Sequence, residues 1–331
     1  MKRREFMIGV GSAAAWPLGA RAQNTSKAAK RITFLPNLVP VALADWLADM
    51  RDLGWTEGRD FTVIQSGIEH GSFISDEAAQ RIVANKPDLI VTVTTTSALA
   101  VQRATGTIPI VMLTSGYPVE AGVADSLAKP GRNATGNAFY ASTGVWGKML
   151  QLLREVKPDI EQVGVLWTYV IPAFPKEEIE PCYAELNSAA RSLDLKLHIM
   201  EAANADQVKA ALTEIEARKI QGLMLTSYIA PQAMPVVTQF AVDKGLPTVI
   251  DFDWTPFLAP PRPILSYAPV YRELVRSVVA SVDKILRGSS PGDIPILQPS
   301  RFELVVDLVT ANSMGLSIPQ DLLFRADRVN E

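Results

Sequence analysis

Short, largely apolar runs alternate along this chain with longer segments in which apolar residues recur every three or four positions. Such runs, without polar residues at every second position, are typical of strands buried on both faces of a parallel sheet. They form two series, at 32–35, 61–65, 89–93, 108–113 and a weaker 134–139, then at 163–167, 196–200, 222–226, 248–251 and 264–267. Their starts lie about 20 to 30 residues apart, the length of one strand plus one crossover helix.

Helical periodicity fills the gaps between these strands. The expected helices run over 42–53, 76–85, 145–156, 177–193, 205–218, 235–244 and 271–287. Several of them stop where a glycine or proline follows, as at Gly54, Gly245 and Gly288. Two successive series of alternating strands and helices predict an α/β protein of two doubly wound, Rossmann-like lobes.

The boundaries of the lobes follow from the same pattern. We expect lobe 1 at 31–138, with a return segment at about 265–298, and lobe 2 at 139–264. The turn-rich stretch 129–136 divides the two series and is interpreted as a hinge, although a Pro-Gly stretch is more commonly a simple loop. A strand at 303–308 and a helix at 310–314 follow, and periodicity does not assign residues 299–331 to either lobe.

The first 22 residues have the order of an export signal. Arg3 and Arg4 precede a weakly apolar stretch at 6–18, and Ala20-x-Ala22 stands before Gln23. The arginine pair resembles the twin-arginine consensus, whereas the alternative is an ordinary amphipathic segment. The stretch is too short for a spanning helix, which needs about 20 apolar residues. We therefore predict export to the periplasm and no direct membrane anchor.

Charge and cysteine content narrow the class of protein. Loss of residues 1–22 removes four basic residues and one acidic residue, so the net charge changes from −3 to −6. Such an acidic body argues against nucleic acid or an anionic membrane as a partner. Cys182 is the single cysteine, which excludes an intramolecular disulfide, and we expect it to be a buried apolar residue.

Motifs for catalysis are absent from the sequence. His70 and His198 lie on different predicted elements, and His198, inside a strand pattern, is interpreted as a structural histidine. We found no metal-ligand spacing and no phosphate-binding loop, and Ser115 has no identifiable histidine partner. The one glycine pattern typical of dinucleotide binding, at 9–14, lies within the export signal. No metal, no cofactor and no catalytic residue are therefore predicted.

Polar residues follow the strands of the first lobe, where ligands bind in open α/β sheets. Asn37 follows the first strand, and four hydroxyl residues at 94–97 follow the third, with Thr95, Thr96 and Ser97 as candidates. Ser115, Gly116 and Tyr117 follow the fourth. Hydroxyls and N–H groups at the start of a helix suit a carboxylate, although Thr96 or Ser97 could instead be a simple helix cap.

The second lobe contributes aromatic rings and carboxylates at the corresponding strand ends. The candidates are Trp167, Tyr169, Tyr228, Asp251 and Asp253. Converging rings can enclose a flat or apolar group and a carboxylate can pair with an ammonium, although single aromatics at strand ends are often packing residues. Together the two lobes predict an amino-acid-like or aromatic carboxylate ligand.

Several blocks of sequence carry a family resemblance. They are residues 53–58 (Leu-Gly-Trp-Thr-Glu-Gly), 118–122 (Pro-Val-Glu-Ala-Gly), 127–136 (Leu-Ala-Lys-Pro-Gly-Arg-Asn-Ala-Thr-Gly), 283–288 and 298–308. Over nearly its whole length the chain resembles substrate-binding proteins of ABC transporters of the tryptophan/tyrosine-uptake type. The resemblance implies a type I periplasmic binding fold, with two lobes joined by three segments and a ligand enclosed between them. Segments 66–73, 167–175 and 251–254 depart from the family pattern, which puts the ligand in question rather than the fold.

These observations predict the solute-binding component of an ABC importer, working as a monomer with permease subunits in the inner membrane. Two other interpretations stay open at this point. One is a periplasmic ligand sensor for a signalling receptor. The other is an exported enzyme that uses Glu69, Asp251 or Asp253 as acid and base groups.

Overall fold

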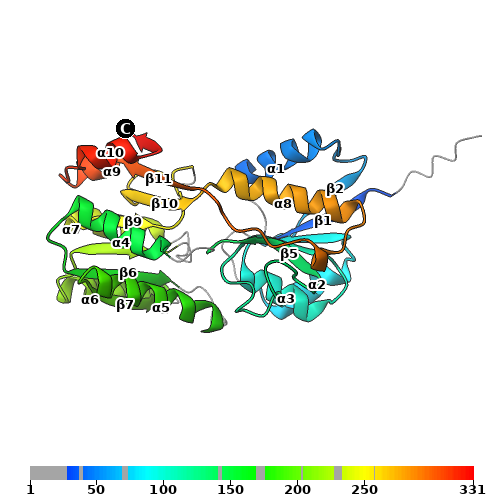
Figure 1. The fold of residues 1–331 in the computed structure, drawn as a ribbon, viewed down its shortest axis with the longest axis horizontal. Helices are drawn as coiled ribbons and strands as arrows, with labels where there is room; N and C mark the ends of the chain where they lie inside the picture. Colours follow the sequence, from blue (N-terminus) through cyan, green and yellow to red (C-terminus); the bar gives the residue numbers. More distant parts are fainter. Residues whose placement is uncertain are drawn as a thin grey trace, which may run out of the picture.

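The computed structural model describes residues 28–36, 40–68, 74–140, 144–168, 176–202, 204–226, 233–256 and 258–331. Two α/β lobes lie side by side in it (Figure 1). The expected signal at 1–22 lies outside the described residues. Within the part that is described, no helix is both long and apolar enough to cross a membrane.

The first lobe is built on a parallel five-stranded sheet of order β2-β1-β3-β4-β5. Its strands are β1 (Lys30–Leu35), β2 (Phe61–Gln65), β3 (Leu89–Thr92), β4 (Ile110–Ser115) and β5 (Ala134–Ala138). Helices cover both faces: α1 (Pro40–Asp52) and α8 (Tyr271–Leu286) on one, α2 (Asp76–Ala84) and α3 (Thr95–Ala104) on the other (Figure 1). The lobe is therefore doubly wound, as the sequence predicts.

The second lobe has a seven-stranded sheet of order β12-β11-β10-β9-β8-β6-β7, parallel except for the β10–β11 pair. Its strands are β6 (Gln162–Thr168), β7 (Lys196–Ala202), β8 (Gly222–Leu225), β9 (Thr248–Ile250), β10 (Leu265–Pro269), β11 (Phe302–Asp307) and β12 (Arg328–Asn330). Helices α4 (Val145–Val156) and α5 (Lys176–Ser192) cover one face, and α6 (Ala205–Ala217) and α7 (Met234–Lys244) the other.

The chain passes between the lobes three times: from β5 to α4, from β10 to α8, and from Leu297 to β11. Leu297 pairs with β5, since its N–H donates to Gly136 O at 2.8 Å and its C=O accepts from Ala138 N–H at 2.8 Å. The first and third connections therefore leave lobe 1 side by side. On the α1/α8 and α4/α5 sides of the sheets, one apolar cluster runs through both lobes and includes Trp46 of α1 and Trp146 of α4.

The C-terminal residues, which periodicity left unassigned, belong to the second lobe. β11 and β12 extend its sheet, and two short helices, α9 (Leu308–Ser313) and α10 (Gln320–Arg325), lie beside them (Figure 1). A 3-10 turn, η1 (Pro291–Asp293), closes the return segment of lobe 1. That segment begins with α8 rather than at about 265, because β10 pairs with β9 in the second lobe.

The predicted hinge at 129–136 is also corrected by the structure. Its first part is a loop held inside lobe 1, where the Asn133 amide donates to the C=O of Thr105 at 3.0 Å and of Ile108 at 2.9 Å. Its last residues form β5. Gly136 has φ +129°, and a Cβ there would lie 2.2 Å from the carbonyl oxygen of Met112 on β4. The glycine thus serves strand packing, and the crossing between the lobes follows β5.

Candidate functional site

The start of α3 and the end of β4 meet through the predicted hydroxyl residues. Thr94 is the N-cap of α3, and its Oγ1 accepts from the Ser97 N–H at 3.2 Å. The cap is therefore Thr94, not Thr96 or Ser97. The Thr94 hydroxyl also lies 3.0 Å from Thr96 Oγ1 and 2.8 Å from Ser97 Oγ. Thr96 and Ser97 therefore lie in the first turn of the helix, where backbone N–H groups and the helix dipole favour an anion.

Thr95 connects this helix start to the fourth strand. Its Oγ1 lies 2.8 Å from Ser115 Oγ and accepts from the Gly116 N–H at 2.9 Å. Thr95, Thr96, Ser97 and Ser115 are all buried. The structure thus brings together the hydroxyl residues that the sequence places after two neighbouring strands, and it fixes Tyr117 directly beyond them.

Tyr117 begins a row of aromatic rings that crosses from lobe 1 to lobe 2. It stacks on Tyr140, with ring centroids 5.5 Å apart and planes at 27°. Tyr140 follows β5 in the first connection, and its ring lies 5.0 Å from that of Trp146 in α4. The Tyr140 hydroxyl donates a short hydrogen bond to Asp251 Oδ2, just after β9. Asp251 is buried, so this contact ties the first connection to the second lobe.

Trp167 lies within the hydrophobic core and is not exposed on the surface of lobe 2. Alternation along β6 puts it on the same face as Val163 and Val165, and its ring packs 6.2 Å from that of Trp146 and 5.5 Å from that of Tyr183. None of its surface is exposed. Trp167 is therefore a packing residue of the lobe 2 core, and its contact with a ligand stays a prediction.

Asp253 has a structural partner as well. Its Oδ2 forms an ion pair with Arg328 of β12, and its Oδ1 accepts from the Thr255 N–H at 3.0 Å. These contacts hold the C-terminal strand against the loop after β9, so the structure gives Asp253 a role away from the row of rings. The remaining candidates, Asn37, Tyr169 and Tyr228, lie outside the described residues.

Helix α5 contributes two residues that the sequence did not indicate, Cys182 and Glu185. Burial holds the pKa of Tyr117 well above its usual range, and the nearby Cys182 thiol and Glu185 carboxyl add to the shift, whereas a hydrogen bond with Trp146 opposes it. Burial also raises the pKa of Glu185. Helical periodicity predicts α5 but not which face meets the other lobe, so the sequence held no signal for this contact.

His198 and Cys182 have the environments predicted for them. His198 Nε2 lies 2.9 Å from Gln162 Oε1, and its pKa is lowered by burial and by Arg218, so it is a structural residue of β7. Cys182 is buried and forms no disulfide. Among the described residues no group of three or more His, Cys, Asp or Glu side chains is arranged to hold a metal ion.

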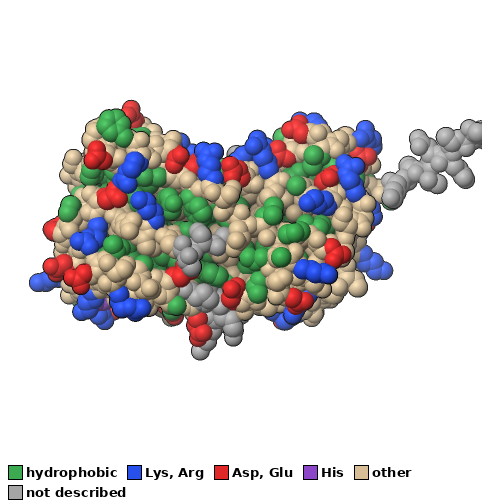
Figure 2. All heavy atoms as spheres, viewed as in Figure 1, with side chains coloured by type: hydrophobic (Ala, Val, Ile, Leu, Met, Phe, Trp, Pro, Cys, Tyr) green, Lys and Arg blue, Asp and Glu red, His purple; other side chains and the backbone are tan. Residues whose placement is uncertain are grey.

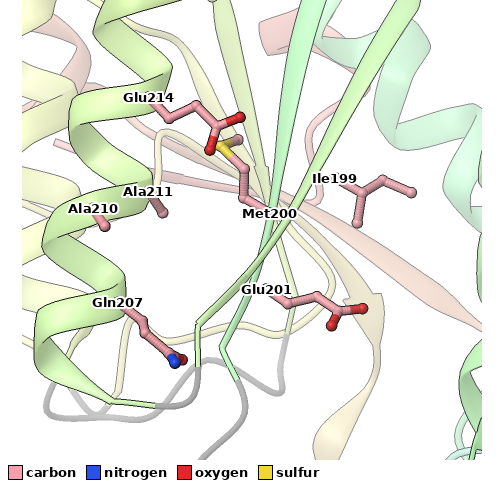
Figure 3. Close-up of a pocket in the computed structure, with 7 residues that line it drawn as sticks. All are labelled: Ile199, Met200, Glu201, Gln207, Ala210, Ala211 and Glu214. Atoms are coloured by element: carbon pink, nitrogen blue, oxygen red, sulfur yellow. The ribbon is translucent and has the colours of Figure 1, made fainter.

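A hollow of about 350 Å³ lies on the outer part of lobe 2 between β7 and α6 (Figure 3). β7 is the last strand of its sheet. The carboxylates lining the hollow are engaged: Glu214 pairs with Arg218 at 2.7 Å, and Glu201 accepts from the Tyr183 hydroxyl. None of the predicted site residues lines it.

Comparison with known proteins decides the family. The family model "ABC transporter substrate binding protein" matches residues 52–330. The chain belongs to this family. It is therefore the solute-binding component of an ABC importer, in a family of extracytoplasmic, non-enzymatic binding proteins.

Individual relatives of this ABC transporter substrate-binding protein agree with the assignment. A tyrosine-binding protein of Clostridioides difficile (strain R20291) is 23% identical over 267 residues, covering 81% of this chain and 74% of the relative. The ABC domain from Streptococcus pneumonia in complex with L-Trp has a TM-score of 0.75 at 18% identity, covering 91% of this chain and 100% of that one.

The fold is shared more widely. A glucose-galactose binding protein of Geobacillus stearothermophilus has a TM-score of 0.56 at 15% identity, covering 85% of this chain and 98% of that one. The two-lobed type I periplasmic binding fold that the sequence resemblance implied is thus confirmed.

Proposed function

We propose that this protein binds an amino acid with an aromatic side chain between its two lobes. The carboxylate would lie at the start of α3, among Thr95, Thr96 and Ser97. The observation that carries the proposal is the position of the Tyr117–Tyr140 stack directly beyond these hydroxyls, since Gly116 is bonded to Thr95 at 2.9 Å. A relative named for tyrosine binding and a similar structure containing L-Trp support the same ligand class.

The proposed mechanism is closure of the lobes around the ligand. The hydroxyl cluster belongs to lobe 1, whereas Trp146, Asp251 and α5 belong to lobe 2. A ligand that contacts both stabilises the closed state by its differential contact energy, and a permease can recognise that state. The three connections allow such a motion. Apolar side chains lie near the middle of the face shown in Figure 2, where the lobes meet.

Export to the periplasm through the twin-arginine signal is a further part of the proposal. Its support is the sequence of residues 1–22, and an importer component of this family works outside the cytoplasm. Replacing Arg3 and Arg4 by lysine should retain the protein in the cytoplasm. N-terminal sequencing of exported protein should find Gln23 first. If the lysine variant were exported as efficiently as the wild type, the protein would not use the twin-arginine pathway.

A thermal-shift screen tests the ligand class. The panel contains L-tryptophan, L-tyrosine, L-phenylalanine, L-leucine and L-lysine. A ligand at 100 times its dissociation constant stabilises the native state by about 2.7 kcal/mol. We expect the aromatic amino acids to raise the melting temperature and L-lysine to leave it unchanged. A shift only with non-aromatic members would contradict the proposal.

A further inference from the structure

The three connections between the lobes converge on one buried side chain, that of Asn137. It lies on β5, the strand from which the first connection leaves lobe 1, and is 1% exposed. Asn137 forms a parallel β-bridge with Leu297, where the third connection leaves lobe 1. Its Nδ2 donates to the C=O of Leu274 at 3.0 Å, in the first turn of α8, directly after the second connection. One residue thus contacts all three connections on the lobe 1 side.

The amide of Asn137 is satisfied in a single orientation. Nδ2 also donates to the C=O of Leu113 on β4 at 3.0 Å, and Oδ1 accepts from the Ser277 hydroxyl on α8 at 2.5 Å. A flipped amide would place Oδ1 against two carbonyl oxygens, which cannot donate to it. Loss of the amide would leave buried polar groups without partners, which is costly. The side chain therefore holds β4, β5 and α8 at a fixed spacing.

The strand that Asn137 holds is also the strand of the hydroxyl cluster. Leu113 lies two residues before Ser115 on β4, and the Ser115 C=O accepts from the Phe139 N–H at 2.5 Å. The Ser115 hydroxyl lies 2.8 Å from Thr95 Oγ1 at the start of α3. The position of the connections relative to the cluster is thus set by β4 and β5 together.

The second and third connections are joined again on the lobe 2 side. Pro269 pairs with Phe302 at the end of the β10–β11 ladder. Between the contacts made in lobe 1 and this pair lie residues 270–273 and 298–301, four in each connection. A change in the angle between the lobes is therefore concentrated in short segments, as in a hinge motion.

We propose that Asn137 is a positioning residue for ligand binding, because it fixes the three connections to lobe 1 as one unit. The lobes then rotate about a single axis and close to one relative orientation. Without the amide, each connection could shift separately against β4 and α8, and the closed state would be a smaller fraction of the ensemble. The role goes beyond the proposed ligand class, since it applies to any solute that the two lobes enclose.

The chain offers a matched control four residues earlier. Asn133 Nδ2 also donates to two carbonyl oxygens, those of Thr105 and Ile108, and its Oδ1 accepts from Gln102 at 3.3 Å. These partners all belong to lobe 1 and none is part of a connection. Asn133→Ala therefore removes the same kinds of hydrogen bond as Asn137→Ala but leaves the connections held, so it reports the effect of lost stability alone.

Double electron-electron resonance on the ligand-free protein tests the proposal by measuring distances between the lobes. Spin labels are attached through Gln80→Cys on α2 and Thr213→Cys on α6, two exposed positions on helices of different lobes. The native Cys182 is buried. We expect Asn137→Ala to broaden the distribution of distances between the labels, whereas Asn133→Ala should keep the wild-type width.

Ser277→Ala is a milder variant, because it removes the hydroxyl bonded to Oδ1 and leaves the Asn137 amide in place. It should broaden the distribution to a smaller extent. A wild-type width in Asn137→Ala, or equal broadening in Asn137→Ala and Asn133→Ala, would overturn the inference. If Asn137→Ala does not fold, Ser277→Ala decides the question, and a wild-type width in that variant overturns the inference as well.

Discussion

The hydroxyl of Tyr140, in the first connection between the lobes, donates a hydrogen bond to the buried carboxylate of Asp251 at the end of β9. The Tyr140 ring also stacks on Tyr117 of lobe 1. One side chain thus contacts both lobes at the place where the chain crosses between them. Any change of the angle between the lobes has to accommodate these two contacts.

Replacing Tyr140 by phenylalanine should destabilise the protein while keeping the ring stack. The substitution removes a donor from a buried carboxylate, which costs about 1–3 kcal/mol. The measurement is the free energy of unfolding from urea denaturation. Tyr183→Phe is the matched control, because it removes a hydroxyl bond to Glu201 in a more exposed setting. An equal decrease in the free energy of unfolding of the two variants would show that the hydrogen bond to Asp251 contributes no more than the exposed one.

Replacing Tyr117 by alanine should weaken binding of L-tryptophan or L-tyrosine at least about tenfold, or about 1.4 kcal/mol, because the ring beyond the hydroxyl cluster is lost. The control is Tyr267→Ala, which removes a ring stacked 5.5 Å from Phe302 within lobe 2. Titration calorimetry on both variants checks the result. If Tyr117→Ala bound the amino acid as tightly as Tyr267→Ala, Tyr117 would not be a residue of the binding site.

Replacing Thr95 by valine keeps the shape of the side chain but removes the hydroxyl that joins Ser115 and Gly116 to α3. We expect ligand affinity to fall about tenfold or more, since the carboxylate site loses its fixed geometry. Thr95→Ser should retain most of the affinity. The exposed Thr107→Val is the control for the loss of a threonine hydroxyl. Tight binding by Thr95→Val would exclude a positioning role for Thr95.

Trp167→Ala should act on stability rather than only on affinity. Trp167 is fully buried between Trp146 and Tyr183, and removal of a buried tryptophan side chain costs about 3–5 kcal/mol. The measurement is again the free energy of unfolding. A loss below about 1 kcal/mol, accompanied by weaker ligand binding, would restore Trp167 as a pocket residue.

Gly136→Ala should be among the least tolerated glycine substitutions. The residue has φ +129°, and an added Cβ would lie 2.2 Å from the Met112 carbonyl oxygen of the neighbouring strand. We expect a loss of stability of several kcal/mol, on the order of 3 or more, or failure to fold. Gly106→Ala is the control, because nothing lies within 4 Å of its added Cβ and its φ is not positive. Similar stability of both variants would show that the strands separate readily here.

Much of the fold could be predicted from the sequence because parallel strands buried on both faces leave an unmistakable apolar run. The strand 89–93 and the helix 271–287 are examples, and the structure places β3 and α8 there. The short elements α10 and β12 were not predicted, because they are too brief to produce a periodic pattern of apolar residues. The hinge was misplaced because Pro-Gly residues at 129–136 mark a turn, and composition does not distinguish a turn within a lobe from a crossing between lobes.

The candidate site was predictable only in part. Hydroxyl residues after adjacent parallel strands necessarily meet at one sheet edge, and the contact between Thr95 and Ser115 confirms that reasoning. Trp167 stays a prediction as a ligand residue: alternation along β6 puts its side chain on the core face, where it packs against Trp146 and Tyr183. Glu185 was missed because the pairing of a helix face with the other lobe depends on tertiary contacts that no local pattern records.

The most direct test of the account is titration calorimetry of L-tryptophan and L-tyrosine into the purified wild-type protein. The account predicts saturable binding of at least one of them, with one ligand bound per chain. Absence of binding by both, under conditions where the protein is folded and monomeric, would contradict it.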